Sequence, residues 1–216
     1  MSSGSLKMEG DIVEQRKCVG EGEKMGAELT PESIREFVIS SHFNLEKVKT
    51  LAAENPALLR AQNRWGEDDF EDGLGAAAHV GNRGIAMFFL SQGVPLTICA
   101  AAMLGDEAAV AAFVAADPAA VNARGAHGIP LMFHAAMSGE VGLAQFLRDK
   151  GCNEGYTFAL HGAIMHGRLE MVRWLLDNGA ADLQIPNYEG KSPLTKAVEL
   201  GHTEIAELLR SRGAME

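Results

Sequence analysis

Apolar side chains recur along one face of a short predicted helix at residues 168–182, whose sequence is RLEMVRWLLDNGAAD. The residues of this face lie at i, i+3, i+6 and i+7, the spacing of an amphipathic helix, and are Leu169, Val172, Leu175 and Leu176. Gly179 follows, and glycine adopts the left-handed conformation that ends a helix more easily than other residues. So short a helix cannot bury its own apolar face, and we therefore expect it to pack against another part of the chain.

The same pattern recurs along most of the chain. Each copy has a helix of small residues, a helix-breaking position and a second helix with larger apolar residues, as in FHAAMSGEVGLAQFLRDKG, LHGAIMHGRLEMVRWLLDNGA and PLTKAVELGHTEIAELLRSRGA. The helix-breaking positions are Phe43, Gly81, Gly105, Gly139, Gly167 and Gly201, at spacings of 38, 24, 34, 28 and 34 residues. Self-similarity of this kind predicts a repeat architecture.

Small residues explain how the copies would pack. Pairs such as Ala77-Ala78, Ala101-Ala102 and Ala135-Ala136 let the first helices of neighbouring copies approach closely, and the bulkier second helix fills the space behind. Each copy leaves an apolar side that only the next copy covers, so stability comes from stacking. We expect an all-α solenoid of about six helix pairs.

The chain divides into two parts. Residues 1–29 are rich in Gly, Ser and charge without an apolar period, which predicts a disordered tail. Thr30, Pro31 and Glu32 are typical of a helix start, so residues 30–216 form the predicted repeat domain. The last copy carries Glu207 and Arg210 on its second helix, the polar face expected of a terminal repeat, so we expect a complete array.

These residues carry a family resemblance. The segment NYEGKSPLTKAVELGHTEIAELLRSRGA resembles the ankyrin-repeat pattern, with Ser192-Pro193-Leu194 and Gly201-His202 in register, and His161 takes the histidine position of the same motif. The resemblance covers residues 31–216 and extends to a group of bacterial ankyrin proteins. It implies helix-turn-helix repeats joined by β-turn loops called fingers, with His161 hydrogen-bonded to a neighbouring loop. Two spacings fall below the family period of about 33 residues, so we expect some shortened fingers.

The 38-residue step contains an insertion, QNRWGEDDFEDG, in which five acidic residues surround two aromatic ones. One interpretation is a loop that offers Trp65 and Phe70 as anchors within an acidic rim that includes Asp68 and Asp69. The other is a turn whose rings fold back over the gap between the first two repeats. In both interpretations the acids face solvent, Glu71 included.

The resemblance also implies a concave surface that commonly contacts partners, formed by the two residues before each central glycine. Most of these positions are apolar. They form either an exposed apolar stripe that contacts a partner, or part of the core, if the short fingers let neighbouring helices cover them. Including the finger side, the candidate partner-binding residues are His79, Val80, Met103, Leu104, Met137, Met165, His166, His127, Tyr188, Glu189 and Lys191.

Catalytic and metal-binding patterns are absent from the sequence. The seven histidines show neither HExxH nor Cys/His spacing, so we expect no metal site and interpret His134, His161 and His202 as structural. The sequence has no GxSxG, phosphate-binding or dinucleotide-binding motif, and Cys99 is expected to be a buried filler. We therefore expect no enzyme and no cofactor.

Composition narrows the function further. The net charge of −10 argues against nucleic acid and anionic membranes, and the three cysteines Cys18, Cys99 and Cys152 lack disulfide spacing. No signal peptide is apparent, so a cytoplasmic protein is expected.

We predict a non-enzymatic module that binds a protein or peptide through the concave apolar stripe of the array, with the acidic insertion attracting basic segments. The chain is expected to be a monomer. The alternative is a self-associating structural protein that forms a homodimer through the same apolar stripe, and a metal-dependent or hydrolytic enzyme would require a polar pocket around His134 and His161.

Overall fold

The computed structural model describes residues 29–180 and 182–215. Of the predicted tail, only Leu29 lies within the described residues, and Cys18 lies outside them.

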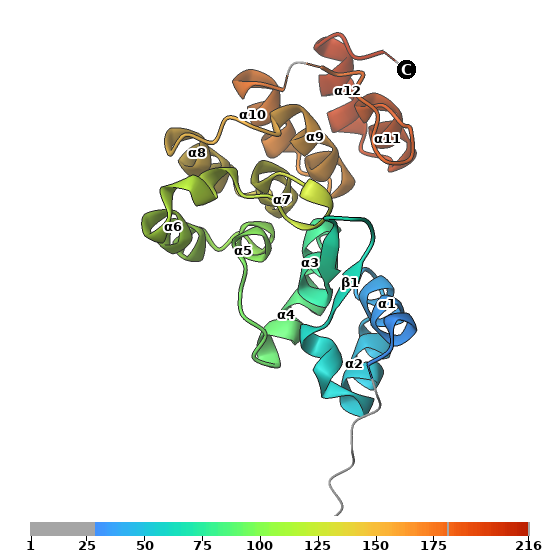
Figure 1. The fold of residues 1–216 in the computed structure, drawn as a ribbon. Helices are drawn as coiled ribbons and strands as arrows, with labels where there is room; N and C mark the ends of the chain where they lie inside the picture. The colour runs from blue at the N-terminus through green and yellow to red at the C-terminus, as the bar shows by residue number, and fades with distance from the viewer. Residues whose placement is uncertain (1–28, 181, 216) are drawn as a thin grey trace, which may run out of the picture.

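The described residues form six pairs of short helices arranged in chain order (Figure 1). The pairs are α1 (Pro31–Ser40) with α2 (Leu45–Glu54), α3 (Gly73–His79) with α4 (Arg83–Ser91), α5 (Ile98–Leu104) with α6 (Glu107–Ala116), α7 (Leu131–Ser138) with α8 (Val141–Asp149), α9 (Tyr156–Met165) with α10 (Leu169–Asn178), and α11 (Pro193–Glu199) with α12 (Thr203–Ser211). The expected all-α solenoid of about six repeats is confirmed.

Local signals determine where these helices begin and turn. Thr30 caps α1, because its hydroxyl oxygen accepts a hydrogen bond from the backbone N–H of Ser33 at 3.1 Å. The five glycines at the predicted helix-breaking positions all have left-handed backbone angles, with φ between 63° and 84°. A left-handed residue reverses the chain between the two helices of a pair, and glycine takes this conformation without a steric penalty.

Long and short connections alternate between the repeats. The three long ones are a hairpin of β1 (Gln62–Arg64) and β2 (Phe70–Asp72), a loop closed by the bridge Arg124–Pro130 that contains the short helix η3 (Ala126–Gly128), and residues 179–192. The 3₁₀ helices η1 (Pro56–Arg60) and η2 (Pro118–Asn122) lead into the first two. The other two connections, residues 92–97 and 150–155, are short, which confirms the shortened fingers.

The inner turns of repeats that are not neighbours come close together. A Cβ atom built on Gly81, after α3, would lie 2.3 Å from the ring Nε2 of His166, after α9, and 3.3 Å from the sulfur of Met137. Phe133 and Met137 of α7 accordingly belong to the apolar cluster of the first repeats rather than only to their own. The array therefore bends sharply enough for repeats two and five to touch.

This bend buries part of the predicted contact stripe. The side chains of Met103 and Met137 are only 1% and 2% exposed, so these two residues belong to the core and not to a partner surface. Arg168 of the next repeat covers the end of α7 as well, because its guanidinium donates to the backbone carbonyl of Met137 at 3.1 Å. For these two residues, the interpretation in which neighbouring elements cover the stripe is the correct one.

Among the described residues, none of the helices has the combination of length and apolar character needed to cross a bilayer.

Candidate functional site

A cavity of about 550 Å³ lies beside the first helices of the repeats. Its wall combines the turn after α1, the end of α3, the first turn of α7, one side of α9 and two of the long fingers. The residues that line it are His42, Phe43, His79, Val80, His127, Ile129, Phe133, Phe158, His161, Met165, Asn187 and Tyr188.

Aromatic side chains form much of this wall. Phe133 and Phe158 stack with their ring centroids 5.0 Å apart. Phe43 and Tyr188 are 72% and 82% exposed, far more than aromatic residues of a packed interface between repeats. His161 secures the finger that carries Tyr188, because its Nε2 donates to the backbone carbonyl of Ile185 at 2.9 Å, the role that the family resemblance implied.

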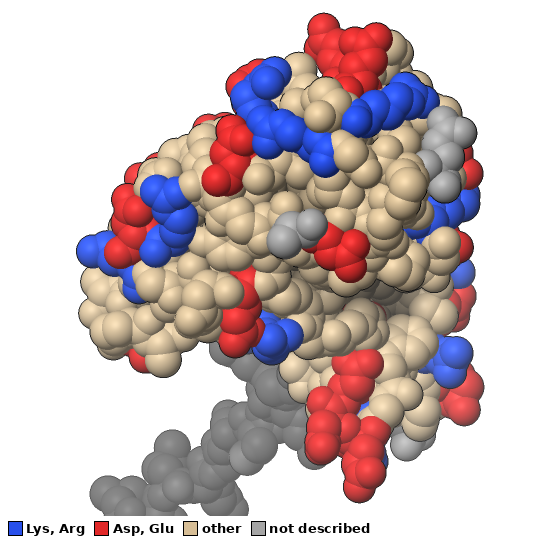
Figure 2. All heavy atoms as spheres, turned by 90° about the horizontal axis from the view of Figure 1, so that it is seen from above, with Lys and Arg blue, Asp and Glu red and all other residues tan. Residues whose placement is uncertain are grey.

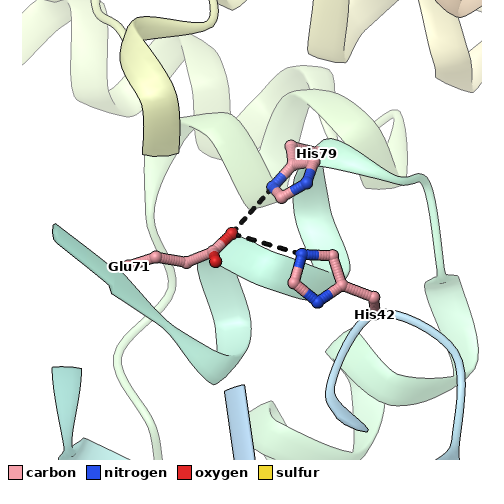
Figure 3. Close-up of side chains that lie close together, drawn as sticks. All are labelled: His42, Glu71 and His79. Carbon is pink, nitrogen blue, oxygen red and sulfur yellow. Dashed lines mark ion pairs between the residues drawn. The ribbon is translucent and has the colours of Figure 1, made fainter. Parts of the chain in front are cut away.

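Three histidines and one glutamate converge at one side of the cavity. Oε1 of Glu71 lies 3.0 Å from Nδ1 of His79 and 3.5 Å from Nε2 of His42 (Figure 3). Nε2 of His127 is the third nitrogen near this oxygen, at 3.4 Å. One ligand atom each from His42, Glu71 and His79 lie within 4.8 Å of one another, so the group could hold a metal ion.

The hairpin places Glu71 at the centre of this cluster. Side chains alternate between the two faces of a strand, so Glu71 points inward while its neighbour Phe70 is half exposed. The indole Nε1 of Trp65 donates to Oε2 of Glu71 at 2.8 Å, which leaves Oε1 facing the imidazoles. Glu71 is 1% exposed, so the expectation that all acids of the insertion face solvent is wrong for this residue.

The other members come from well-defined backbone positions. His42 lies in the turn between α1 and α2, and His79 is the last residue of α3. His127 lies in η3 with φ of 56°, the one positive φ of a residue other than glycine in residues 29–180 and 182–215. Asp69 holds it there, because its carboxylate accepts from the backbone N–H of His127 at 3.2 Å and lies 2.8 Å from Nδ1.

Opposing effects set the charge states within the cluster. Burial alone would raise the pKa of Glu71, but the adjacent His42 and His79 hold it well below its ordinary value. Burial likewise favours neutral His42, but the Glu71 carboxylate and the backbone carbonyls of Ile39 and Val38 together outweigh it and raise the pKa of that imidazole. Glu71 is therefore a carboxylate, the form that attracts a cation.

The two aromatic residues of the insertion behave differently from each other. Trp65 is partly buried, with the guanidinium carbon of Arg35 lying 5.1 Å from its ring centroid. Its ring is thus folded back onto the chain, toward Arg35 of α1 and Glu71, which agrees with the second interpretation for this residue. Phe70 is directed outward, and Asp68 is exposed beside it.

The remaining predicted residues divide into two groups. Those that line the cavity are His79, Val80, His127, Met165 and Tyr188. Those that lie elsewhere are Met103 and Met137 in the core, the half-buried Leu104, His166 beside Gly81, Trp65, Asp68, Asp69 and Phe70 on the hairpin, and Glu189 and Lys191. The last two belong to a surface network, in which Lys191 pairs with both Glu189 and Glu199.

Sequence reasoning missed several wall residues, above all His42, Phe43, Phe133 and Phe158, and it missed Glu71. Motif spacing could not identify the cluster, because its members come from four separate segments. The repeat register contained a signal, since His42 and His79 both lie just before the helix-breaking position of successive repeats. Equivalent positions of neighbouring repeats lie side by side in a solenoid.

The buried thiols and His134 do not form a nucleophilic site. Burial raises the pKa of Cys99 to about 12 and lowers the pKa of His134 to about 4, and His134 Nδ1 faces the carbonyl of Pro130 at 3.1 Å. Burial also raises the pKa of Cys152. A thiolate is the reactive form of cysteine, so both sites favour an inert thiol.

Charged side chains leave wide uncharged areas on the face of the molecule in Figure 2. Acidic and basic side chains lie side by side at several places there, and uncharged surface lies between these groups.

Comparison with known proteins identifies similar sequences. A family model described as ankyrin repeats (3 copies) matches residues 98–187 and 132–215, together more than half of the chain. The FYVE zinc finger domain protein UPA1 of Mycosarcoma maydis is 35% identical over 82 residues, which is 38% of this chain and 6% of that protein. The matched part is thus a small fraction of that relative's length.

Proposed function

Because this chain belongs to the ankyrin-repeat family, whose repeats generally serve as protein–protein interaction modules, we propose that it binds a short segment of a partner protein in the cavity lined by Phe43, Phe133, Phe158 and Tyr188. The fold alone does not assign a function, so the proposal rests on the properties of this cavity.

The observation that carries the proposal is the pair of exposed rings at an apolar cavity. Phe43 and Tyr188 leave most of their surface in water although they adjoin a largely apolar wall. Large exposed apolar groups are costly, and aromatic residues commonly supply the anchors of protein interfaces. A partner that inserts an apolar side chain would cover both rings and fill the cavity.

The size and charge of the site describe the segment that fits. A cavity of about 550 Å³ lies within the range of pockets that enclose small ligands, so it suits one part of a peptide rather than a broad protein surface. Asp68 is exposed on the nearby hairpin, and the whole chain carries a net charge of −10. We propose an apolar side chain flanked by Lys or Arg, since opposite charge speeds association.

Burial of the methionines weakens the homodimer alternative. That alternative relied on an apolar stripe that included Met103 and Met137, and both side chains lie in the core. We propose a non-enzymatic monomer, a state that light scattering at high protein concentration tests directly. The protonated state favoured for Cys99 supports a binding role over a catalytic one.

Peptide display tests the proposed function. Peptides selected on the purified chain should share a large apolar residue next to basic ones. The double substitution Phe43→Ala with Tyr188→Ala should weaken binding of a selected peptide by about 2 kcal/mol or more, because both anchors are lost. Fluorescence anisotropy with a labelled peptide measures this change.

Met87→Ala is the matched control, because Met87 is also exposed, at 55%, but does not line the cavity. This variant should bind as the unmodified chain does. Equal binding by the double variant, or selected peptides with no shared apolar residue, would contradict the proposal.

A further inference from the structure

We infer that His42, His79, His127 and Glu71 bind one divalent transition-metal ion, and that Zn²⁺ fits the group best. The inference rests on the side-chain cluster alone and does not depend on the proposed peptide binding. The ligand atoms would be Nε2 of His42, Nδ1 of His79, Nε2 of His127 and Oε1 of Glu71.

The distances from Glu71 Oε1 to the three imidazoles match the edges of a tetrahedral zinc site. Zinc lies about 2.0–2.1 Å from imidazole nitrogen and carboxylate oxygen, so the edges of such a tetrahedron are about 3.3–3.4 Å long. The three distances from Glu71 Oε1 to the ring nitrogens are 3.0, 3.4 and 3.5 Å. The ligand atoms of His42, Glu71 and His79 already lie within 4.8 Å of one another, and a turn of the exposed His127 ring toward them would complete the site.

In His42 and His127, the partner of the ring nitrogen that faces away from Glu71 indicates whether the other ring nitrogen is free to bind a metal. Nδ1 of His42 lies 3.0 and 3.1 Å from the carbonyls of Val38 and Ile39. Carbonyl oxygens only accept hydrogen bonds, so this nitrogen carries the proton and Nε2 of the neutral ring is an acceptor. In the same way, the Asp69 carboxylate beside Nδ1 of His127 places the proton there and leaves Nε2 as the ligand atom.

Hydrogen bonding alone does not satisfy the cluster. Glu71 Oε1 and His79 Nδ1 are buried without a hydrogen-bond partner of suitable geometry, although they lie 3.0 Å apart. A carboxylate oxygen has two lone pairs, too few for three in-line N–H donors. A single cation would satisfy the oxygen and all three nitrogens at once.

The residues around the cluster support the same assignment. Metal-bound histidines almost always donate their other N–H to a carboxylate or backbone carbonyl, and metal-bound carboxylates are themselves hydrogen-bonded. The Asp69 carboxylate accepts from Nδ1 of His127, and a backbone carbonyl of α1 accepts from Nδ1 of His42. The indole of Trp65 donates to Glu71 Oε2 at 2.8 Å. The hairpin thus supplies one ligand and two supporting side chains.

A metal here would join four elements of the chain. The four ligands come from the α1–α2 turn, β2, the end of α3 and η3. Bound metal would therefore hold the hairpin and the second finger against the first two repeats, and we assign it a structural role.

Metal analysis and cobalt spectroscopy test the inference. The full chain without a histidine tag should retain one Zn²⁺ per molecule after dialysis against ZnSO₄ and then metal-free buffer, as measured by mass spectrometry of the metal content. Co²⁺ added to chelator-treated protein should produce the strong visible absorption of tetrahedral coordination, and Zn²⁺ should abolish that absorption. These two measurements need no variant.

Substitutions locate the metal. His127→Ala and His79→Ala should each remove the tetrahedral cobalt spectrum, and Asp69→Asn should weaken zinc binding about 10–100-fold. His202→Ala is the matched control, because His202 lies at the start of α12 outside the cluster, and it should bind zinc normally. Far-ultraviolet circular dichroism checks that each variant is folded, and His127 lies on a finger, where substitution least disturbs the helices.

Two results would overturn the inference. One is an unmodified chain that retains no stoichiometric zinc and gives no tetrahedral cobalt spectrum. The other is a folded His127→Ala or His79→Ala variant whose zinc affinity and cobalt spectrum are unchanged.

Discussion

Met103 and Met87 lie on helices of neighbouring repeats, yet their side chains differ greatly in exposure. Met103 is 1% exposed at the inner end of α5, and Met87 is 55% exposed on the outer helix α4. The environment of each side chain, and not its residue type, decides what a substitution costs.

We predict that Met103→Ala lowers the free energy of unfolding by about 2–5 kcal/mol, because it leaves a cavity in a packed core. Met87→Ala should change it by about 0.5 kcal/mol or less. Urea denaturation followed by circular dichroism measures both values. Equal small effects would show that the inner end of α5 is open to solvent.

His134 makes stability depend on pH. Burial lowers the pKa of this imidazole to about 4 in the folded chain, whereas an unfolded histidine titrates near 6.5. Below pH 6.5 the unfolded state binds a proton that the folded state does not, so this residue removes stability as the pH falls from about 6.5 to 4.

We predict a loss of about 1 kcal/mol from His134 between pH 7.5 and pH 5.5. His134→Gln should remove that share of the loss, since glutamine does not titrate. Urea denaturation of both proteins at the two pH values makes the comparison. A pH dependence that is identical in the variant would contradict the prediction.

Among the elements, the β1–β2 hairpin differs most from what its sequence indicates. Five acidic residues in six positions predict a solvent-facing turn. The strands are too short for the alternation of inward and outward side chains to be recognised in the sequence. The pairing Asn63–Glu71 turns one acid inward, where Trp65 and three histidines surround it. Such burial depends on partners from distant segments, and local patterns carry no information about them.

The turns after the helices, in contrast, were predicted well. Gly81 and Gly93 both have left-handed angles, with φ of 74° and 76°, but only Gly81 lies against another repeat. The two positions therefore separate the cost of the backbone angle from the cost of crowding.

We predict that Gly93→Ala destabilises the chain by about 1 kcal/mol, because alanine disfavours a left-handed angle. Gly81→Ala should cost about 2–3 kcal/mol, since its Cβ would also collide with the ring of His166. Thermal or urea unfolding provides the comparison. If both variants lose the same stability, the turns of repeats two and five do not touch in solution.

At the scale of the whole molecule, repeat periodicity predicted the architecture and the alternation of long and short connections. It did not predict the bend, because curvature arises from small rotations at every junction, which add up along the array. The location of the cavity follows from that bend and from the fingers, so its wall could only be identified in part. His79, His127 and Tyr188 were recognised because they occupy finger or inner-turn positions of the family pattern.

The contact between Gly81 and His166 has a mechanical consequence. In an ordinary repeat array, tension applied to the two ends passes through every repeat in turn. Here the turns of repeats two and five meet, so they form a shortcut across the chain between them. Pulling on the ends would load this contact in parallel with the repeats between the two turns, so part of the force would bypass residues 82–165.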